Sequence, residues 1–414
     1  MESPLPQDQT VPDQTRVSLW VIFRSYFVIG LTAFGMAILQ KLKALVARNR
    51  WLTEEEMEEG LALVQLYPGP IMVDFTAFVG YRLRGVTGAV LAATGFILPT
   101  FVLMTGLSAL YFAAGAFPGV HQLFLGLEAV VVGILFNVTI DMGGRSIQHR
   151  AQAIIMLLAF AALMFKVNAI LIVLSALIAG ALFIRTKGGK SQNGETPGRI
   201  AIEPDAATAE RSSPKRWLGI GVVVGVILAL AGFSWSLHSE TGRVALSFFK
   251  IGSVAFGNGT TILPLVQASA VDSNRWLTMA QFADGIALSQ ITPGPFLIIA
   301  TFIGYKIGGI LGGMLATFAI FAPSVAMTLI FTELFSRLRN LKPVRGALSG
   351  VLASFVGLLA VVLLQLGSAT LTGPAPIALS AGAFVAVRWF KLDILWVFLG
   401  GLLLWGGLLL TGVA

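Results

Sequence analysis

The sequence contains no cysteine among its 414 residues. Disulfides, thiolate metal sites and cysteine nucleophiles are therefore excluded. Charge is scarce as well, because Asp, Glu, Lys and Arg make up only 12% of the residues, while 56% are hydrophobic. This charged fraction is about half of what soluble proteins carry. It is too low to cover a water-exposed globule of this size, so the lipid bilayer is expected to be the main solvent.

Signatures of enzymes are missing too. The three histidines, His121, His149 and His238, are far apart, and none stands at metal-binding spacing from a glutamate. No Gly-x-Ser-x-Gly motif occurs, and no phosphate-binding loop follows a strand. We therefore expect neither an enzyme, nor a metal site, nor a cofactor. A membrane-embedded enzyme or a lipid-handling protein is the alternative class, and it would need clustered acid, base or metal ligands.

What the sequence does contain is an internal duplication. Short segments return in the same order, at an offset that stays between 222 and 225 residues. Apolar sequence alone does not keep order and spacing in this way, so we predict two related halves, as in many secondary transporters. The matched segments are 33–35 with 255–257, 50–53 with 275–278, 65–70 with 290–295 and 80–82 with 304–306, and Pro99, Gly126 and Gly133 match Pro323, Gly350 and Gly357.

Apolar runs predict an all-α, polytopic transmembrane helical bundle, at about 20 residues per crossing. We expect about thirteen spans, near 17–39, 59–81, 86–112, 119–141, 151–165, 167–184, 217–235, 244–268, 282–305, 310–334, 346–366, 375–387 and 392–412. The predicted organisation is a disordered N-terminal tail (1–16), a first repeat (17–184), a linker with a connecting span (185–243) and a second repeat (244–414).

Six spans, one connecting span and six more would give the second repeat the opposite orientation. The basic residues test this arrangement, because Lys and Arg are enriched in cytoplasmic loops. Nineteen of them fall on the side of the N-terminus and seven on the other, with Arg24 and Lys250 left inside spans. We therefore predict two inverted-topology repeats, a cytoplasmic N-terminus and an external C-terminus. This bias also accounts for the net charge of +8 without a nucleic-acid partner.

Pro68-Gly69-Pro70 and Pro293-Gly294-Pro295 are the strongest local signals. Each pair of prolines removes two backbone donors and forces the preceding residues to be extended, so a continuous helix cannot pass. Broken backbone at membrane depth is tolerated where protein or a water-filled cavity surrounds it. The helix that follows each break begins with free N–H groups, which favour an anion. The alternative is that both motifs merely kink packed helices.

Other candidates for substrate binding surround the two motifs. Glutamine and threonine side chains offer uncharged hydrogen-bond donors to an oxyanion, and glycines allow close approach of the backbone. The Phe-Gly segments late in the first span of each half belong to this group, although helix packing alone would also explain their glycines. These candidates are Gly35, Gln65, Gly257, Asn258, Gly259, Gln290, Thr292 and Thr301.

Four charged residues inside predicted spans are candidates for coupling or charge compensation. Asp74 follows the first break and Glu128 lies mid-span, and ionisable groups at such depth are usually functional. We consider both as proton carriers for coupling. Arg24 and Lys250 could neutralise a substrate anion or extend to the interface. The alternative is structural, with Arg24 or Lys250 pairing with one of the acids.

The repeated Arg-Trp-Leu-Thr segment lies between the first two spans of each half. The stretch from Lys41 to Glu59 predicts an amphipathic surface helix, with Thr53 as an N-cap before an acidic turn. Trp51 and Trp276 are expected in the aromatic belt at the membrane interface.

Taken together, these motifs resemble the chromate ion transporter family in its long, two-domain form. The shared features are the Ala-Phe-Gly end of the first span, the Arg-Trp-Leu-Thr segment, the Gln-x-x-Pro-Gly-Pro break and the Gly-Tyr-Lys/Arg exit, over about residues 20–140 and 245–365. The resemblance implies a multi-pass transporter of the bacterial inner membrane that exports chromate, driven by the proton gradient. Its partners would be an oxyanion and the lipid bilayer, and a homodimer is considered. A transporter of another small solute is the remaining alternative.

The first half departs from the family pattern at two places. Family members usually carry Phe-Gly-Gly-Pro where this chain has 34–37, and Asn-Ser-Thr-Gln where it has Ile71-Met72-Val73-Asp74. An acid at the latter position would repel a dianion unless it is protonated or serves coupling.

Overall fold

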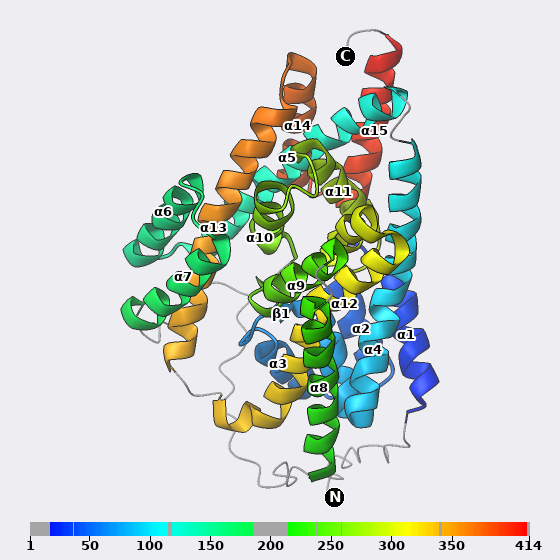
Figure 1. Cartoon of the computed structure of the whole chain (residues 1–414), viewed down its shortest axis with the longest axis vertical. Coiled ribbons are helices and arrows are strands. Elements are labelled where there is room, and N and C mark those ends of the chain that lie inside the picture. The colour runs from blue at the N-terminus through cyan, green and yellow to red at the C-terminus, as the bar shows by residue number, and fades with distance from the viewer. Residues whose placement is uncertain are drawn as a thin grey trace, which may run out of the picture.

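The structure is a computed structural model that describes residues 17–35, 37–114, 118–184, 214–236, 239–257, 259–338 and 342–411. The predicted tail (1–16), the hydrophilic part of the linker (185–213) and Asn258 lie outside the described residues. The described chain is helical apart from one pair of two-residue strands. The predicted all-α class is therefore confirmed (Figure 1).

The described part of the first half contains seven helices and the first strand. They are α1 (Leu19–Thr32), α2 (Ala37–Arg48), α3 (Glu54–Leu63), β1 (Gly69–Pro70), α4 (Ile71–Ala114), α5 (Pro118–Ser146), α6 (Arg150–Met164) and α7 (Ala169–Phe183). A connecting helix follows, α8 (Pro214–Ser236).

The second half repeats this order with a more broken second helix. Its elements are α9 (Glu240–Ser253), β2 (Phe256–Gly257), η1 (Gly259–Ile262), α10 (Leu263–Gln267), η2 (Ala268–Ser273), α11 (Met279–Ile291), η3 (Phe296–Ile298), α12 (Ile299–Leu338), α13 (Lys342–Thr370), α14 (Pro374–Arg388) and α15 (Ile394–Leu410).

Helix length and exposed apolar side chains identify a multi-pass membrane protein. Within the described residues, five apolar helices are long enough to cross a membrane, and they lie at 71–113, 122–146, 216–234, 296–334 and 346–370. Shorter apolar helices accompany them. Large hydrophobic side chains point outward from several helices, as Leu403 of α15 does with 77% of its surface exposed. An apolar exterior of this kind suits contact with lipid rather than with water.

The two halves repeat each other in backbone conformation. Helix α4 turns back on itself at Arg84 (φ −141°, ψ 23°) and Gly85 (φ 62°, ψ −150°). Helix α12 does so at Gly308 (φ −142°, ψ 25°) and Gly309 (φ 59°, ψ −146°). Because positive φ favours glycine, the sequence provides one at both turns.

Each of these two helical hairpins closes tightly on small residues. A Cβ atom at Gly80 would lie 2.4 Å from the carbonyl oxygen of Gly88, and one at Gly304 would lie 2.3 Å from that of Gly312. The repeated Gly-Tyr-Lys/Arg motif is therefore required for packing, because its glycine lets the two arms of each hairpin touch.

The halves are also interlocked. Helix α5 of the first half packs on α14 and α15 of the second, and α13 of the second packs on α6 and α7 of the first. Repeated glycines form these crossings. A Cβ at Gly133 would lie 2.2 Å from the Ser380 oxygen, and one at Gly357 would lie 2.2 Å from the Met156 oxygen. Matched glycines therefore bring the backbones of different halves into contact.

The first expected spans of each half, 17–39 and 244–268, are not continuous helices. Helix α1 ends at Thr32 and α9 ends at Ser253. Glycines in left-handed conformation cause the interruptions, with φ +51° at Gly35 and +84° at Gly257. Helix α2 then packs back along α1, because Trp20 of α1 and Arg48 of α2 line the same groove. This part of the chain enters the bundle and returns.

The repeated Arg-Trp-Leu-Thr segment also differs from expectation. Arg50 (φ 51°) ends α2 in left-handed conformation, so the helix predicted from Lys41 to Glu59 is in fact two helices. The predicted N-cap is confirmed, since Thr53 forms a capping box with Glu56. The two tryptophans are buried in protein rather than turned outward, with Trp51 8% and Trp276 5% exposed. Buried side chains of this size anchor the segment instead.

Candidate functional site

Both Pro-Gly-Pro motifs interrupt helices, as predicted. In the first half α3 ends at Leu63, and α4 starts at Ile71 after β1. In the second half α11 ends at Ile291, and α12 starts after the short helix η3. Proline supplies no N–H group, so the chain cannot continue the helical hydrogen-bond ladder through these motifs. Their free backbone groups need partners elsewhere.

Those partners come from the opposite half of the chain. Strand β1 pairs in parallel with β2, which sets Gly69 opposite Phe256 and Pro70 opposite Gly257. In the matching place, the N–H of Gly294 donates to the carbonyl oxygen of Ala33 over 2.9 Å. The structure thereby brings each break to the Phe-Gly segment of the other half.

Side chains at the breaks also contact the opposite half. The Tyr67 hydroxyl is hydrogen-bonded to that of Thr328 on α12, over 2.8 Å. The Thr292 hydroxyl lies 4.0 Å from the Met104 sulfur on α4. Tyr67 and Thr292 hold corresponding positions, as do Thr328 and Met104. Each break therefore rests on the long helix of the opposite half.

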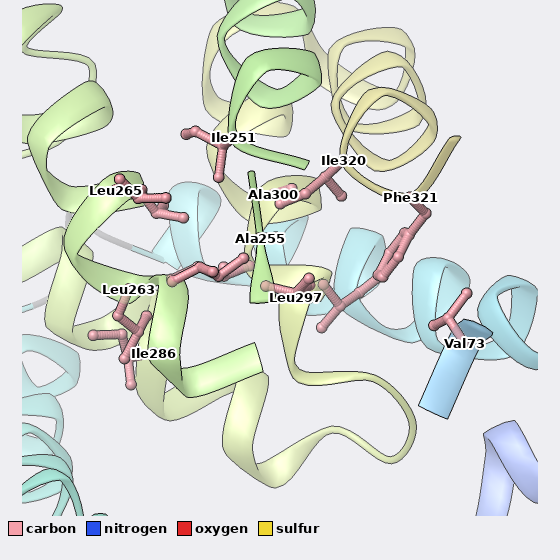
Figure 2. Packing of buried hydrophobic residues seen from close by; sticks show 14 of the residues in the cluster. Val73, Ile251, Ala255, Leu263, Leu265, Ile286, Leu297, Ala300, Ile320 and Phe321 are labelled. Carbon is pink, nitrogen blue, oxygen red and sulfur yellow. The ribbon is translucent and has the colours of Figure 1, made fainter. Parts of the chain in front are cut away.

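Apolar packing surrounds the second break. Figure 2 shows Ala255, Leu297 and Ala300 in one cluster with Ile320 of α12, and all four belong to the main hydrophobic core. A Cβ at Gly259 would lie 3.0 Å from the Phe296 side chain. The backbone of Gly259 consequently lies against the segment that follows the break.

The central glycine of each motif has no room for a side chain. A Cβ at Gly69 would lie 1.9 Å from Asp74 Oδ2, and one at Gly294 would lie 2.0 Å from Thr100 Oγ1. Gly294 is also in left-handed conformation, with φ +97°. The glycines are therefore fixed by the geometry of the breaks and not only by helix ending.

Exposure differs between the predicted binding residues of the two halves. In the first half Gly35 and Gln65 are exposed, and Pro68 is half-buried. In the second half Gly257, Gly259 and Gln290 are half-buried, and Thr292 and the Pro-Gly-Pro motif are buried. Gln65 and Pro68 are therefore more exposed than their counterparts Gln290 and Pro293, whereas Gly69, Pro70, Gly294 and Pro295 are all buried.

Thr301 does not offer a free hydroxyl. It is fully buried, and its Oγ1 is hydrogen-bonded to that of Thr317 over 2.5 Å. Both residues lie on α12, on the two arms of its hairpin. Thr301 therefore stabilises the hairpin in this structure.

Asp74 lies directly against the first break. It is fully buried, and the hydroxyl groups of Ser324 and Thr328 lie beside its carboxyl group. Neither carboxyl oxygen has a hydrogen-bond partner of good geometry among the described residues. A buried carboxylate without a cation or firm donors is costly, which favours the neutral acid here.

Glu128 is also buried, with 1% of its surface exposed, and its carboxyl group meets that of Asp284. Arg24 and Lys250 are exposed, and neither forms an ion pair with a described acid. The structural alternative, in which one of these cations pairs with Asp74 or Glu128, is therefore wrong. Arg24 instead lines the open groove of about 520 Å³ between α1 and α2, together with Lys41 and Arg48.

Sequence reasoning missed Asp284, Tyr67 and Tyr111. Asp284 was a detectable signal, since it is an acid inside the apolar helix that leads to the second break. Tyr111 donates to Asp284 Oδ2 over 2.5 Å. Its role could not be found from sequence, because the two residues are 173 positions apart. Among the described residues, no group of three His, Asp or Glu side chains could hold a metal ion.

The fold and the paired breaks define a multi-pass membrane protein built from two related halves around interrupted helices. The family model for the chromate transporter matches residues 20–181 and 242–405, so the chain belongs to the chromate transporter family. The predicted resemblance is thereby confirmed.

Curated relatives cover most of the chain. A chromate transport protein of Pseudomonas aeruginosa is 30% identical over 84% of this chain and 81% of its own length. One of Cupriavidus metallidurans is 28% identical over 86% of both chains. An uncharacterised transporter of Methanocaldococcus jannaschii is 28% identical over 83% of both. No solved structure matches the chain. Because family and relatives are transporters, this chain is a transporter and not an enzyme.

Replacing Gly69 or Gly294 by alanine should block transport. The added Cβ has no space at either position, and Gly294 would also be strained in left-handed conformation. Strain of this kind costs about 1–3 kcal/mol, so anion flux in proteoliposomes should fall about tenfold or more.

The matched control is Gly106→Ala on α4, where no heavy atom lies within 4 Å of the new Cβ. All three variants should insert and remain monodisperse in detergent. Normal flux in both break variants would show that the motifs only kink packed helices.

Proposed function

We propose that this protein is a secondary active transporter that moves chromate, or a sulfate-like oxyanion, across the bacterial inner membrane by alternating access at its two breaks. The main support for the proposal is that each break is hydrogen-bonded to the other half. Gly69–Pro70 pairs with β2, and the N–H of Gly294 donates to Ala33. The chromate transport proteins among the relatives support the choice of substrate.

The proposed anion site lies where α4 and α12 begin. Helix α4 starts directly after the first break, and α12 follows the second break through the short helix η3. A helix N-terminus carries about half a positive charge from its free N–H groups. Gln65 and Gln290 precede the breaks and can donate to an oxyanion. No buried cation is needed at such a site, since two helix ends share the negative charge of a dianion.

Alternating access is supported by the unequal exposure of the two halves. Corresponding residues of the two halves are of the same type but differ in exposure. Gly35 and Gln65 are exposed, while their counterparts Gly257 and Gln290 are half-buried. In a protein with inverted repeats, the opposite state arises when the halves exchange conformations. In the proposed opposite state, corresponding residues of the two halves exchange their exposures.

The proposed orientation follows from the distribution of Lys and Arg between the two sides of the membrane, counted again with the contacts that these residues make. Arg82 pairs with Glu56 of α3, which places the start of α3 beside the α4 turn. Because α2 returns along α1, its later cations Lys43 and Arg48 belong with Arg50 to the side of the N-terminus, while Lys41 donates to the carbonyl oxygen of Thr32 at the other end of α1. The bias then changes from nineteen against seven to twenty-one against four, since Lys43, Arg48 and Arg50 join that side, Arg275 leaves it and Lys41 is assigned to neither side, like Arg24 and Lys250.

Contacts near the start of α9 support moving Arg275. Arg243 donates to Asn274 over 3.1 Å, so Arg275 lies with the external group. Lys166 lies near Asp272 and therefore belongs to the same external group as Arg275. Burial raises the pKa of Asp272, and the positive charge of Lys166 partly opposes this effect. A stronger excess of positive charge on one side favours a cytoplasmic N-terminus and an external C-terminus.

This orientation can be tested by single cysteines, because the chain has none of its own. Glu55 and Ser273 are both exposed and lie at corresponding ends of the two halves. In intact cells a membrane-impermeant maleimide should label Ser273→Cys, and it should label Glu55→Cys only after permeabilisation. Labelling of both positions from one side would rule out inverted halves.

The substrate can be tested with purified full-length protein in liposomes. Chromate should be taken up when a pH gradient is imposed, and sulfate should compete because it is a dianion of the same tetrahedral shape. Empty liposomes and the Gly294→Ala variant serve as controls. Absence of flux for chromate, sulfate and related oxyanions under every ion gradient would overturn the proposed function.

Asp74 and Glu128 are the proposed proton carriers. Asp74→Asn keeps the shape of a neutral acid but cannot release a proton. Anion exchange at equal pH should therefore persist, while accumulation driven by a pH gradient should fall about fivefold or more, the range of ordinary coupling energies. Asp141→Asn is the matched control, since Asp141 is exposed and pairs with Arg145. Unchanged gradient dependence in Asp74→Asn would remove Asp74 from the coupling scheme.

A further inference from the structure

Two carboxyl groups from different halves meet inside the bundle. Glu128 belongs to α5 of the first half and is 1% exposed, and Asp284 belongs to α11 of the second half and is 2% exposed. The hydroxyl of Tyr111, on α4, donates to Asp284 Oδ2 over 2.5 Å. Three helices therefore meet at one buried acidic centre, away from the breaks' own acid, Asp74.

The close approach of the two acids favours a proton between them. The carboxyl group of Asp284 lies beside that of Glu128, where α5 packs on α11. Ionised carboxylates only accept hydrogen bonds, so the two groups can be hydrogen-bonded to each other only when one of them carries the hydrogen. Glu128 Oε1 is buried without a hydrogen-bond partner among the described residues, which leaves one acceptor position open inside the centre. Two negative charges this close in a low dielectric would repel strongly.

The surroundings offer little to ionise the pair fully. Lys306 of α12 is the nearby cation, and it bonds to Gln281 and lies 6.0 Å above the Phe112 ring. Helix α15 packs on both α5 and α11 and has no ionisable side chain between Ile394 and Leu410. Helix α13 has none between 346 and 370. On α14, Arg388 lies 4.0 Å from Asp141, near the far end of α5.

Aromatic rings cover the centre. The Tyr111 ring lies against Phe112, Phe124 and Phe302, with centroid separations of 5.0, 5.0 and 5.2 Å. Phe112 in turn stacks with Tyr305, the other titratable group on the α12 face. Tyr111 is thereby fixed as a donor to Asp284, and the rings keep bulk water away from the two acids.

We propose that Glu128 and Asp284 form one proton-binding site that holds a single shared proton, with Tyr111 as a positioning residue. The inference rests on the proposed function in taking this proton as the one exchanged for the anion. The step is a simple acid dissociation, in which the carboxylic O–H breaks and the proton passes to water, leaving one carboxylate that accepts from Tyr111.

Comparison of the halves indicates when the proton would leave. Leu352 occupies the position of Glu128 in the second half, and it lies 3.8 Å from a Cβ built at Gly257. If the halves exchange conformations, Glu128 would move to the matching place beside Gly35, which is exposed. The pair would separate there, and Glu128 would lose its proton to water.

Infrared difference spectroscopy of the reconstituted full chain tests the pair without transport. Wild-type protein at neutral pH should show a carbonyl band of a protonated acid that Glu128→Gln and Asp284→Asn each remove. The double variant should remove no more intensity than either single variant, because one proton is shared. Tyr111→Phe should shift the band without removing it, and Asp141→Asn should leave it unchanged.

Two spectroscopic outcomes would overturn the proposal. One is a wild-type spectrum at neutral pH without any carboxylic band that these variants remove, which would mean that the pair is ionised. The other is a double variant that loses twice the intensity of each single one, which would mean two separate protons. The wild-type spectrum decides the first point even if a variant fails to fold.

Transport measurements then test the coupling role. Glu128→Gln and Asp284→Asn should retain chromate exchange at equal pH and lose gradient-driven accumulation about fivefold or more. If both variants accumulate chromate like wild type, the shared proton is not the coupling proton. If wild-type protein moves no oxyanion at all, the proposed function fails, while the infrared result still decides whether the proton site exists.

Discussion

A polypeptide that leaves its helix inside a membrane has no water to satisfy its free amide groups, and each such group would cost several kcal/mol. In this chain, each half supplies hydrogen-bond partners for the interrupted backbone of the other half. The first break forms a two-residue ladder with Phe256-Gly257, and the second donates from Gly294 to Ala33. The interrupted backbone on which the proposed anion site depends therefore exists only when both halves are in place.

Small residues make this arrangement possible, because backbone contact leaves no space for side chains. Gly80 and Gly304 close the two hairpins, while Gly133 and Gly357 bring the halves together. Without a hydrophobic force between helices in lipid, close van der Waals packing is the main source of association. Rigid surroundings of this kind allow acids such as Asp74 to stay buried, since the fold rather than a counter-ion holds them.

Much of the fold could be predicted because short local motifs determine the breaks and reveal the duplication. Pro-Gly-Pro stops a helix wherever it occurs, and a capping threonine starts one, as Thr53 does. The return of α2 along α1 was missed, because an apolar stretch of the right length reads as a single span. The left-handed residues Gly35 and Arg50 decide otherwise, and their conformation depends on packing.

The site was only partly predictable for a related reason. Residues next to the motifs, such as Gln65 and Asp74, are found by proximity in sequence. Thr301 was expected to bind substrate, yet its hydroxyl is engaged by Thr317, which only the hairpin brings close. The contacts of Tyr67 with Thr328 and of Glu128 with Asp284 join positions far apart in the chain. A single sequence carries no signal for such pairs, because nothing local distinguishes their members from other polar residues in spans.

The interlocking of α5 with α14 and α15 has a consequence for biogenesis. Ribosomes make the first half many seconds before the last two helices exist, so α5 enters the bilayer with its glycine-lined face covered only by lipid. The earliest part of the protein is completed by its latest part. Assembly of this transporter therefore ends with the docking of the carboxyl-terminal helices, and truncation there would harm the opposite half first.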